Sequence, residues 1–189
     1  RRLEADGLAL GDAGDDELFG GEDADSIFGG EGADSIFGGL GEDVLDGGED
    51  NDLVVGLDGD DEITLADGDD MGFGGQGNDS ISGDAGDDEL FGGQGDDSIF
   101  GGDGNDTLTG ELGRDVLTGG EGEDVFVLSL DGAVTDISQA DIVEDFSFED
   151  DRIGLTDGLA ETDVVLENVT VGDRSGVAVK VIATDAILG

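Results

Sequence analysis

The sequence contains no histidine, cysteine, proline, tryptophan or tyrosine, and it has only 6 basic residues. Without cysteine the fold has no disulfide bonds. Without histidine and cysteine, the usual ligands of catalytic zinc and the members of most nucleophilic triads are missing. We therefore predict that this chain of 189 residues is not an enzyme.

Acidic residues dominate the composition, and 52 of them give the chain a formal net charge of −46 at pH 7. Such a polyanion repels nucleic acids and anionic membranes, so we expect no nucleic-acid partner. It also repels itself, which disfavours a compact chain unless cations neutralise it. No apolar run is long enough to span a bilayer, so we predict no transmembrane segment. The chain starts at Arg1 and shows no signal peptide, which indicates a fragment or a processed piece.

A period of nine residues runs without a break from Gly11 to Val127, giving thirteen repeats. Position one is glycine in twelve repeats, and position eight is Leu, Ile, Val or Phe in twelve. Position four is glycine except at Asp23 and Asp50, whose turns we expect to differ. Position six is aspartate in all thirteen repeats, at Asp16, Asp25, Asp34, Asp43, Asp52, Asp61, Asp70, Asp79, Asp88, Asp97, Asp106, Asp115 and Asp124. A solvated acidic face needs no fixed register, so this period indicates a repeated structural unit.

The period predicts an all-β fold. Positions seven to nine form a short strand whose middle residue faces the core, and positions one to six form a glycine-rich turn. Asn and Asp, frequent at position five, tolerate left-handed backbone angles and suit such a turn. Two repeats make one coil of 18 residues, so the chain forms a parallel β-roll, a right-handed β-solenoid. Odd and even repeats build one sheet each.

The same geometry stacks the aspartates in two columns, with neighbours one strand spacing apart, about 4.8 Å. Calcium binds oxygen at about 2.4 Å, so an ion fits between two such carboxylates and also accepts carbonyl oxygens from the turns. Seven aspartates in the odd column leave six gaps, and six in the even column leave five. The sequence therefore predicts several Ca²⁺ ions, with at most eleven sites between repeats.

Repeats such as GGEGADSIF, GGQGNDSIS, GGQGDDSIF and GGDGNDTLT resemble the nonapeptide of repeats-in-toxin (RTX) proteins. The resemblance covers residues 11–127. It implies a β-roll with calcium between its turns and export by the type I secretion machinery, hence a secreted or cell-surface location. It also implies that each ion takes position-six carboxylates from repeats two apart and turn carbonyls, which by position include those of Gly32, Gly77, Gly95 and Gly104.

Residues 128–189 are not periodic, but segments 124–130, 140–155, 163–171 and 176–183 alternate as strands do. The stretch DIVEDFSFEDDRIGL resembles the segment after the roll in serralysin-type proteases and many RTX proteins, particularly cyanobacterial ones. This implies a β-rich cap that covers the open sheet edges, packed through Phe126, Ile142, Phe146 and Ile153. It also implies an export signal near the C-terminus, where Asp185-Ala186-Ile187-Leu188 is similar to the ending of some members. We divide the chain into a lead-in (1–10), the roll (11–127) and a cap and secretion-signal region (128–189).

Two features leave alternatives open. Position nine of the odd repeats is largely apolar and includes Phe19, Phe37, Phe73 and Phe91. This stripe either docks a partner, such as a second copy of the chain, or its rings pack at the corner of the roll. In repeat seven, Gly72 lacks the core side chain, and we expect a local register shift that brings neighbouring Met71 or Phe73 into the space.

The leading hypothesis is a calcium-binding module that folds on binding calcium, within a secreted or cell-surface protein. One alternative is the C-terminal domain of a secreted protease or lipase whose catalytic part is absent from these residues. Another is a structural unit of a surface layer or filament.

Overall fold

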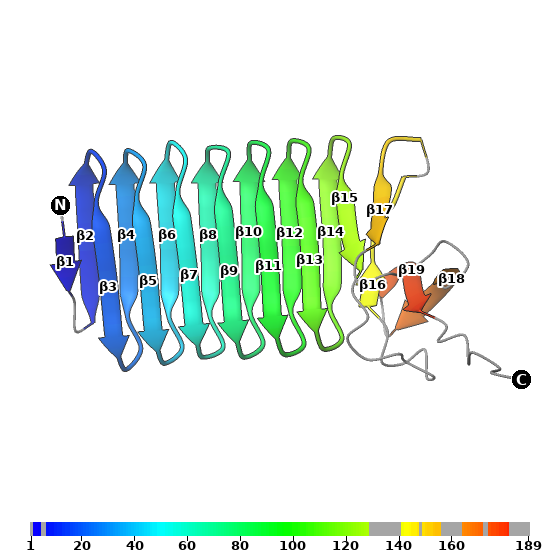
Figure 1. Ribbon diagram of the computed structural model, residues 1–189, viewed down its shortest axis with the longest axis horizontal. Coiled ribbons are helices and arrows are strands. Elements are labelled where there is room, and N and C mark those ends of the chain that lie inside the picture. Colours follow the sequence, from blue (N-terminus) through cyan, green and yellow to red (C-terminus); the bar gives the residue numbers. More distant parts are fainter. Residues whose placement is uncertain are drawn as a thin grey trace, which may run out of the picture.

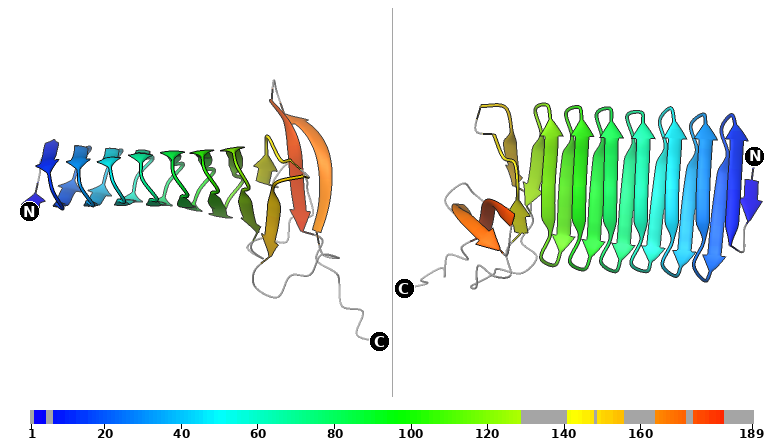
Figure 2. Two further views of the ribbon diagram at one scale, coloured as in Figure 1. Left: turned by 90° about the horizontal axis from the view of Figure 1, so that it is seen from above. Right: turned by 180° about the vertical axis from the view of Figure 1, so that it is seen from behind.

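The computed structural model describes residues 2–4, 7–128, 141–147, 149–155, 164–171 and 174–181. These residues form strands and turns and no helix, and therefore no helix that would cross a membrane. Successive coils stack into a rod whose strands alternate between two sheets (Figure 1). Seen from above, the two sheets form two layers along the rod (Figure 2). The predicted all-β solenoid is confirmed.

The odd sheet has nine strands and is parallel throughout. It contains, in spatial order, β1 (Arg2–Glu4), β3 (Glu17–Glu22), β5 (Ser35–Leu40), β7 (Leu53–Asp58), β9 (Met71–Gln76), β11 (Glu89–Gln94), β13 (Thr107–Leu112), β15 (Val125–Leu128) and β17 (Arg152–Leu155).

The even sheet has ten strands, and its strands of the repeats also pair in parallel. It begins with β2 (Leu8–Ala13), β4 (Ser26–Glu31), β6 (Val44–Glu49), β8 (Glu62–Asp67), β10 (Ser80–Ala85), β12 (Ser98–Asp103) and β14 (Val116–Glu121). It ends with β16 (Asp141–Val143), β19 (Arg174–Val181) and β18 (Val164–Val171), of which the last two form an antiparallel pair. Odd and even repeats thus build separate sheets, as predicted. The first strands, β1 and β2, already begin within residues 1–10.

The strands are twice as long as predicted. Each strand from β2 to β14 covers six residues, from position seven of one repeat to position three of the next, so only positions four to six form the turn. Pairing continues through the glycines, as in Gly21 with Gly39, because coils of identical length bring identical backbone segments into register. The six-residue turn predicted from glycine content was therefore wrong. Glycine at position one instead marks close stacking of neighbouring coils. Position two has a positive φ angle within the strand, as in Gly21 (129°), which favours glycine.

Position eight forms the core. Its side chains are at most 2% exposed, and they face one another across the two layers: Leu18, Ile27, Ile36, Leu45, Val54, Ile63, Ile81, Leu90, Ile99, Leu108, Leu117 and Phe126. Position one faces inward as well, because it lies two residues further along the same strand. The resulting core is a thin apolar column along the axis of the rod.

Repeat seven keeps its register, so the predicted register shift was wrong. Gly72 pairs with Leu90, and Phe73 pairs with Phe91. The space beside Gly72 is filled by Leu65, which stands at position one, where twelve repeats have glycine. Leu65 is fully buried, and its Cδ1 atom lies 3.0 Å from the place that a Cβ on Gly72 would take.

Position nine carries aromatic pairs on the outer face of the odd sheet. The rings of Phe19 and Phe37 stack with centroids 5.1 Å apart, and those of Phe73 and Phe91 stack at 4.7 Å. All four side chains are half-buried. The rings therefore cover each other across adjacent strands, and whether they also dock a partner stays a prediction.

Beyond the repeats, β16 and β17 add one strand to each sheet at the end of the roll, and β19 and β18 extend the even sheet. Strands therefore occur in all four segments that alternate in the sequence. Of the four predicted packing residues, Phe126 belongs to the core cluster, and Phe146 and Ile153 pack against it. Ile142 is buried but lies outside this cluster, because its neighbour Val143 pairs with Leu117 and takes the core position. Residues 182–189, with the predicted export signal, lie outside the described residues.

Candidate metal centre

The position-six aspartates line the insides of the turns. Every one of the thirteen is at most 8% exposed. The backbone N–H of each aspartate from Asp16 to Asp106 donates to the Oδ1 atom of the aspartate one coil later, at 2.7 to 3.0 Å. The carboxylates thus stack in two columns, one at each side of the roll. Their role as metal ligands remains a prediction.

The second carboxylate oxygen, Oδ2, accepts no such hydrogen bond in most of these aspartates. Ten aspartates have a buried Oδ2 atom without a hydrogen bond: Asp34, Asp43, Asp52, Asp61, Asp70, Asp79, Asp88, Asp97, Asp106 and Asp115. Burying a carboxylate oxygen without a hydrogen bond costs free energy, because the oxygen loses its hydrogen bonds to water and makes none in the protein. The ten unpaired oxygens recur at a fixed interval, five in each column.

Burial also shifts the ionisation of these groups. Desolvation is the main cause that raises the pKa of Asp52, Asp88, Asp97 and Asp115 to about 7 from the ordinary 3.8, and the charge of a neighbouring aspartate in the column adds to it. The hydrogen bond from the preceding coil opposes this shift. The column without cations therefore favours neutral carboxyl groups, and a bound cation would reverse that preference.

Glycine at position one makes room for the Oδ2 atom. A Cβ on Gly47 would lie 2.5 Å from Asp52 Oδ2 and 2.9 Å from the carbonyl oxygen of Leu65 in the next coil. The same two kinds of oxygen crowd the corresponding point at Gly29 and Gly83. A carboxylate oxygen and a main-chain carbonyl thus converge beside each such glycine. This is the mixed oxygen environment that calcium accepts.

The predicted backbone ligands lie in the turns of the same columns. No hydrogen bond between described residues ends on the carbonyl oxygens of Gly32, Gly77, Gly95 or Gly104, and these glycines are half-buried. The carbonyl oxygens of Gly77, Gly95 and Gly104 face the position-four glycine one coil later. They are therefore available acceptors, and their role as ligands stays a prediction. Within the described part of the chain, no three acidic side chains gather closely enough to hold a metal ion, so a site here would also need oxygens other than carboxylates.

Asp23 and Asp50, whose turns we expected to differ, keep the positive φ angle of position four. Both have positive φ angles, 99° and 76°, as glycine does at position four in the neighbouring repeats. Aspartate is one of the few residues with a side chain that tolerates this conformation. The φ angle of position four is therefore kept in these two repeats.

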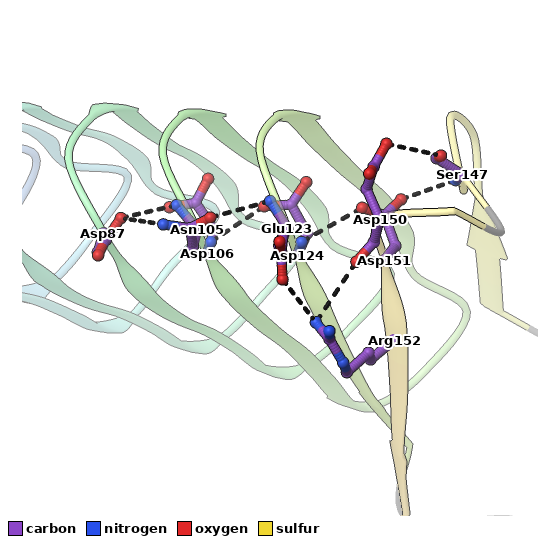
Figure 3. A network of polar contacts seen from close by, with 9 residues as sticks. All are labelled: Asp87, Asn105, Asp106, Glu123, Asp124, Ser147, Asp150, Asp151 and Arg152. Carbon is purple, nitrogen blue, oxygen red and sulfur yellow. Dashed lines mark hydrogen bonds and ion pairs between the residues drawn. The ribbon is translucent and has the colours of Figure 1, made fainter.

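Position five has a different role from the one predicted. Its Asn and Asp residues have no positive φ angles; positive values occur at positions two and four. Instead, their side chains accept hydrogen bonds from the backbone of the next coil. Asn105 N–H donates to Asp87 Oδ1 at 2.8 Å, and Glu123 N–H donates to Asn105 Oδ1 at 3.0 Å (Figure 3). These exposed hydrogen bonds at position five connect neighbouring turns beside the buried columns.

Two aspartates beyond the repeats continue the columns, and the sequence analysis missed them. Asp115 N–H donates to Asp141 Oδ1 at 3.0 Å, and Asp124 N–H donates to Asp151 Oδ1 at 3.2 Å. Burial raises the pKa of Asp141 to about 6. Asp141 and Asp151 stand two residues before a core-facing aliphatic, Val143 and Ile153, as position six does in the repeats. This local pattern was a usable signal, hidden because insertions break the period of nine.

Comparison with known proteins agrees with this geometry. The family model described as RTX calcium-binding nonapeptide repeat (4 copies) matches six overlapping segments: 10–45, 37–72, 46–81, 66–99, 73–108 and 100–130. A search of curated proteins found no match. The solenoid of such repeats is a structural calcium-binding fold rather than a catalytic one. The matched segments cover more than half of the sequence, and the chain therefore belongs to the RTX calcium-binding nonapeptide repeat family.

Proposed function

We propose that this chain is a module that folds when calcium binds in its turns, within a protein that type I secretion delivers to the cell surface or the medium. One observation carries the proposal: ten position-six aspartates have a buried carboxylate oxygen without a partner, in unbroken series along both columns. Without cations these carboxylates repel one another and disfavour burial. With calcium between them, the same burial becomes favourable.

The ligands of each ion would be position-six carboxylates of successive coils and carbonyl oxygens of the turn between them. Calcium takes six to eight oxygens at about 2.3–2.6 Å and tolerates irregular geometry. The carbonyls of Gly32, Gly77, Gly95 and Gly104 have no competing hydrogen bond from described residues. The eleven gaps between repeats set the upper limit of such sites.

Circular dichroism in EDTA and then in calcium tests the proposal. At a calcium concentration ten times the dissociation constant, each site adds about 1.4 kcal/mol to folding. We expect a disordered spectrum in EDTA and a β spectrum in millimolar calcium at pH 8. A β spectrum that is the same in EDTA and calcium would refute calcium-induced folding.

Magnesium provides the matched control ion. It requires six short bonds in near-octahedral geometry and gives up its water reluctantly. Carbonyls whose spacing is set by stacked strands cannot contract to those distances. Folding should therefore need much more magnesium than calcium, and equal midpoints would argue against the proposed ligand set.

Export is the second part of the proposal. A chain with 52 acidic residues and no bound calcium is expanded, which suits passage through a secretion channel. Calcium in the medium would then drive folding after export. Deleting residues 182–189 tests the C-terminal signal: secretion by a host with a type I system should stop, while calcium-induced folding of the purified variant persists.

A structural unit of a surface layer or filament is the second candidate function. Its support is the N-terminal end of the rod, where β1 and β2 are the outermost strands of their sheets. On β2, Leu8 and Leu10 are 61% and 54% exposed. Light scattering in calcium tests this: self-association that Leu8→Lys with Leu10→Lys abolishes would support stacking at this end.

The stripe of Phe19, Phe37, Phe73 and Phe91 is the other candidate contact surface. Between its two ring pairs lies Val55, and neighbouring Leu57 and Met71 are 45% and 38% exposed. We propose that this outer face contacts a second copy or a partner protein. We expect the double variant Phe37→Ser with Phe73→Ser to lose association and the Leu8 and Leu10 variant to keep it. That result would place the contact on this face.

A further inference from the structure

The outer surface of the odd sheet has an uncharged area in the middle of the rod (Figure 1). Side chains at positions seven and nine point away from the core, because they alternate with the buried positions eight and one. In the neighbouring strands β5, β7 and β9 none of these outward-facing residues is charged, although 52 of the 189 residues of the chain are acidic. This area, the uncharged face, consists of Ser35, Phe37, Leu53, Val55, Met71 and Phe73.

The middle of the even sheet differs from the uncharged face. In β6, β8 and β10 the same outward-facing positions include Asp46 and Glu62, so charged side chains interrupt the surface there. Asp84, at position two of β10, adds a further exposed carboxylate. The two sides of the rod therefore present different chemistry at the same coils, and a contact through the odd sheet is distinguishable from one through the even sheet.

Leu57 adjoins the uncharged face and is unfavourable to folding in two ways. It lies two residues after Val55 on β7, and it is 45% exposed. Its φ angle is 86°, whereas its partners on the adjacent strands, Gly39 and Gly75, are glycines with positive φ. Cβ atoms on these glycines would lie 2.2 and 2.1 Å from a carbonyl oxygen of the preceding coil, so this position has little room for a side chain. An exposed apolar side chain on a strained backbone indicates a role in binding rather than in stability.

Exposed carboxylates surround the uncharged face. Glu17 on β3 and Glu89 on β11 occupy position seven of the adjacent odd strands, one on each side along the rod. Asp69 precedes β9, and Asp58 ends β7. None of these four residues stands at position six, so they lie outside the two aspartate columns. An apolar area enclosed by negative charge is complementary to a surface that has an apolar centre and positive charge around it.

A second copy of this chain does not have that complementarity. Packing two odd sheets face to face brings the surrounding carboxylates of both copies together, and each chain has a formal net charge of −46. Calcium in all eleven proposed sites would still leave each chain negative. We infer that the uncharged face, with Leu57 as its anchor, binds a different protein whose contact surface has an apolar centre flanked by lysine or arginine. This inference rests on the contact role proposed above for this face, and it selects one of the two occupants named there.

Binding of designed peptides to the full chain in saturating calcium tests the inference. The probe is an amphipathic helical peptide with leucine on one face and lysine on both sides of that face. A scrambled peptide of the same composition controls for attraction between opposite charges, and a peptide with glutamate in place of lysine controls for apolar contact alone. In fluorescence anisotropy, the leucine–lysine peptide should bind about tenfold more tightly than either control.

Leu57→Gly separates binding from folding. The substitution introduces the residue that the adjacent strands have and relieves the strained backbone, so the calcium midpoint for folding should not rise. The affinity for the leucine–lysine peptide should nevertheless fall about tenfold, because the anchor is lost. Ala66→Gly is the matched control: it relieves a φ angle of 79° at position two of the even sheet and should leave the affinity unchanged.

Charge variants test the surrounding carboxylates. Glu17→Gln with Glu89→Gln should weaken binding of the leucine–lysine peptide and make it less sensitive to salt, because two of the surrounding charges are lost. Glu62→Gln with Asp84→Asn removes the same number of charges from the even sheet and should have a much smaller effect. Equal effects of the two double variants would contradict a localised contact on the odd sheet.

The outcomes separate this inference from the proposed function. A chain that is equally folded in EDTA and in calcium would overturn calcium-induced folding, and the same differences in peptide binding would still be expected. Equal affinity of the wild type and Leu57→Gly, or equally tight binding of the glutamate peptide, would overturn the inference alone. Self-association in calcium that Leu57→Gly abolishes would also overturn it, because a second copy would then be the occupant.

Discussion

Leu65 fills the space that the missing side chain of Gly72 leaves in the core, with Leu65 Cδ1 3.0 Å from where a Cβ of Gly72 would stand. Each residue departs from the repeat: twelve repeats have glycine at position one and an aliphatic or phenylalanine at position eight. The two positions face the same interior from consecutive strands in opposite sheets, β8 and β9. The departures therefore compensate each other and leave the strand register unchanged.

This pair predicts strong coupling between the two sites. Leu65→Gly alone should destabilise the calcium-loaded chain by about 2–5 kcal/mol, because it leaves a cavity. Gly72→Leu alone should cost about 1–3 kcal/mol through overpacking. The double variant restores the repeat consensus and should lose much less than the sum. Urea denaturation in saturating calcium measures the three losses.

Ile27→Ala combined with Gly72→Leu is the control for this cycle. These residues lie in β4 and β9 and share no contact in the described core, so their losses should add. Additive losses in the Leu65 and Gly72 pair as well would show that Leu65 does not fill the space beside Gly72.

The stacked rings of Phe73 and Phe91 predict a second, smaller coupling. Centroids 4.7 Å apart with planes at 4° favour a stacking energy of about 0.5–1.5 kcal/mol beyond burial. Changing both residues to leucine should therefore cost less than the sum of the single changes. Phe100, which is 43% exposed and flanked by Ser82 and Thr118, should show no coupling with Phe73. Equal coupling in both pairs would contradict the stacking argument.

The sequence predicted those features that the period itself enforces. Thirteen aspartates and twelve apolar residues at fixed positions determined the two sheets, the thin core and the two columns. The strand length was predicted wrongly because glycine at positions one and two was interpreted as turn, although these residues still pair between stacked coils. Asp141 and Asp151 were missed because insertions separate them from the repeats. The compensation between Leu65 and Gly72 could not be predicted, because the sequence alone does not show which positions face the same interior.

The raised pKa values of the buried aspartates predict that the calcium-free chain folds at acidic pH. A carboxyl group whose pKa is higher in the folded than in the unfolded chain binds its proton more tightly when folded. For Asp52 and Asp88 this stabilising contribution is complete below the ordinary 3.8 and is lost as pH rises through about 7. In metal-free buffer, circular dichroism should therefore show β structure near pH 4 and its loss by pH 8.

Two measurements support the interpretation of that titration. Light scattering must accompany it, because the sequence pI is about 4.1 and a chain near zero net charge associates. In the presence of calcium, the pH dependence of folding should be the opposite, because protons compete with calcium for the carboxylates. The calcium concentration at the folding midpoint should therefore rise as pH falls from 8 to 6. Calcium-free folding that is unaffected by pH would contradict the role of the buried carboxyl groups.

Position along a column predicts the effect of losing one carboxylate. Asp88 lies inside the odd column: its Oδ1 accepts Asp70 N–H, and its own N–H donates to Asp106 Oδ1, both at 2.9 Å. An ion on each side would share it. Asp16 is the first aspartate of the same column and would serve one ion. Asp88→Ala should therefore raise the calcium midpoint for folding more than Asp16→Ala.

This comparison is well matched, because both substitutions remove the same side chain from the same repeat position and the same sheet. The loss at Asp88 also breaks the contact between coils in the middle of the rod, so folding has to bridge the defect from both sides. At Asp16 the defect lies one coil from the end, and the remaining coils stack without it. Calcium titrations followed by circular dichroism give the two midpoints directly. Equal midpoints would mean that neighbouring ions do not share ligands along the column, and each site would then have to draw its carboxylate from a single coil.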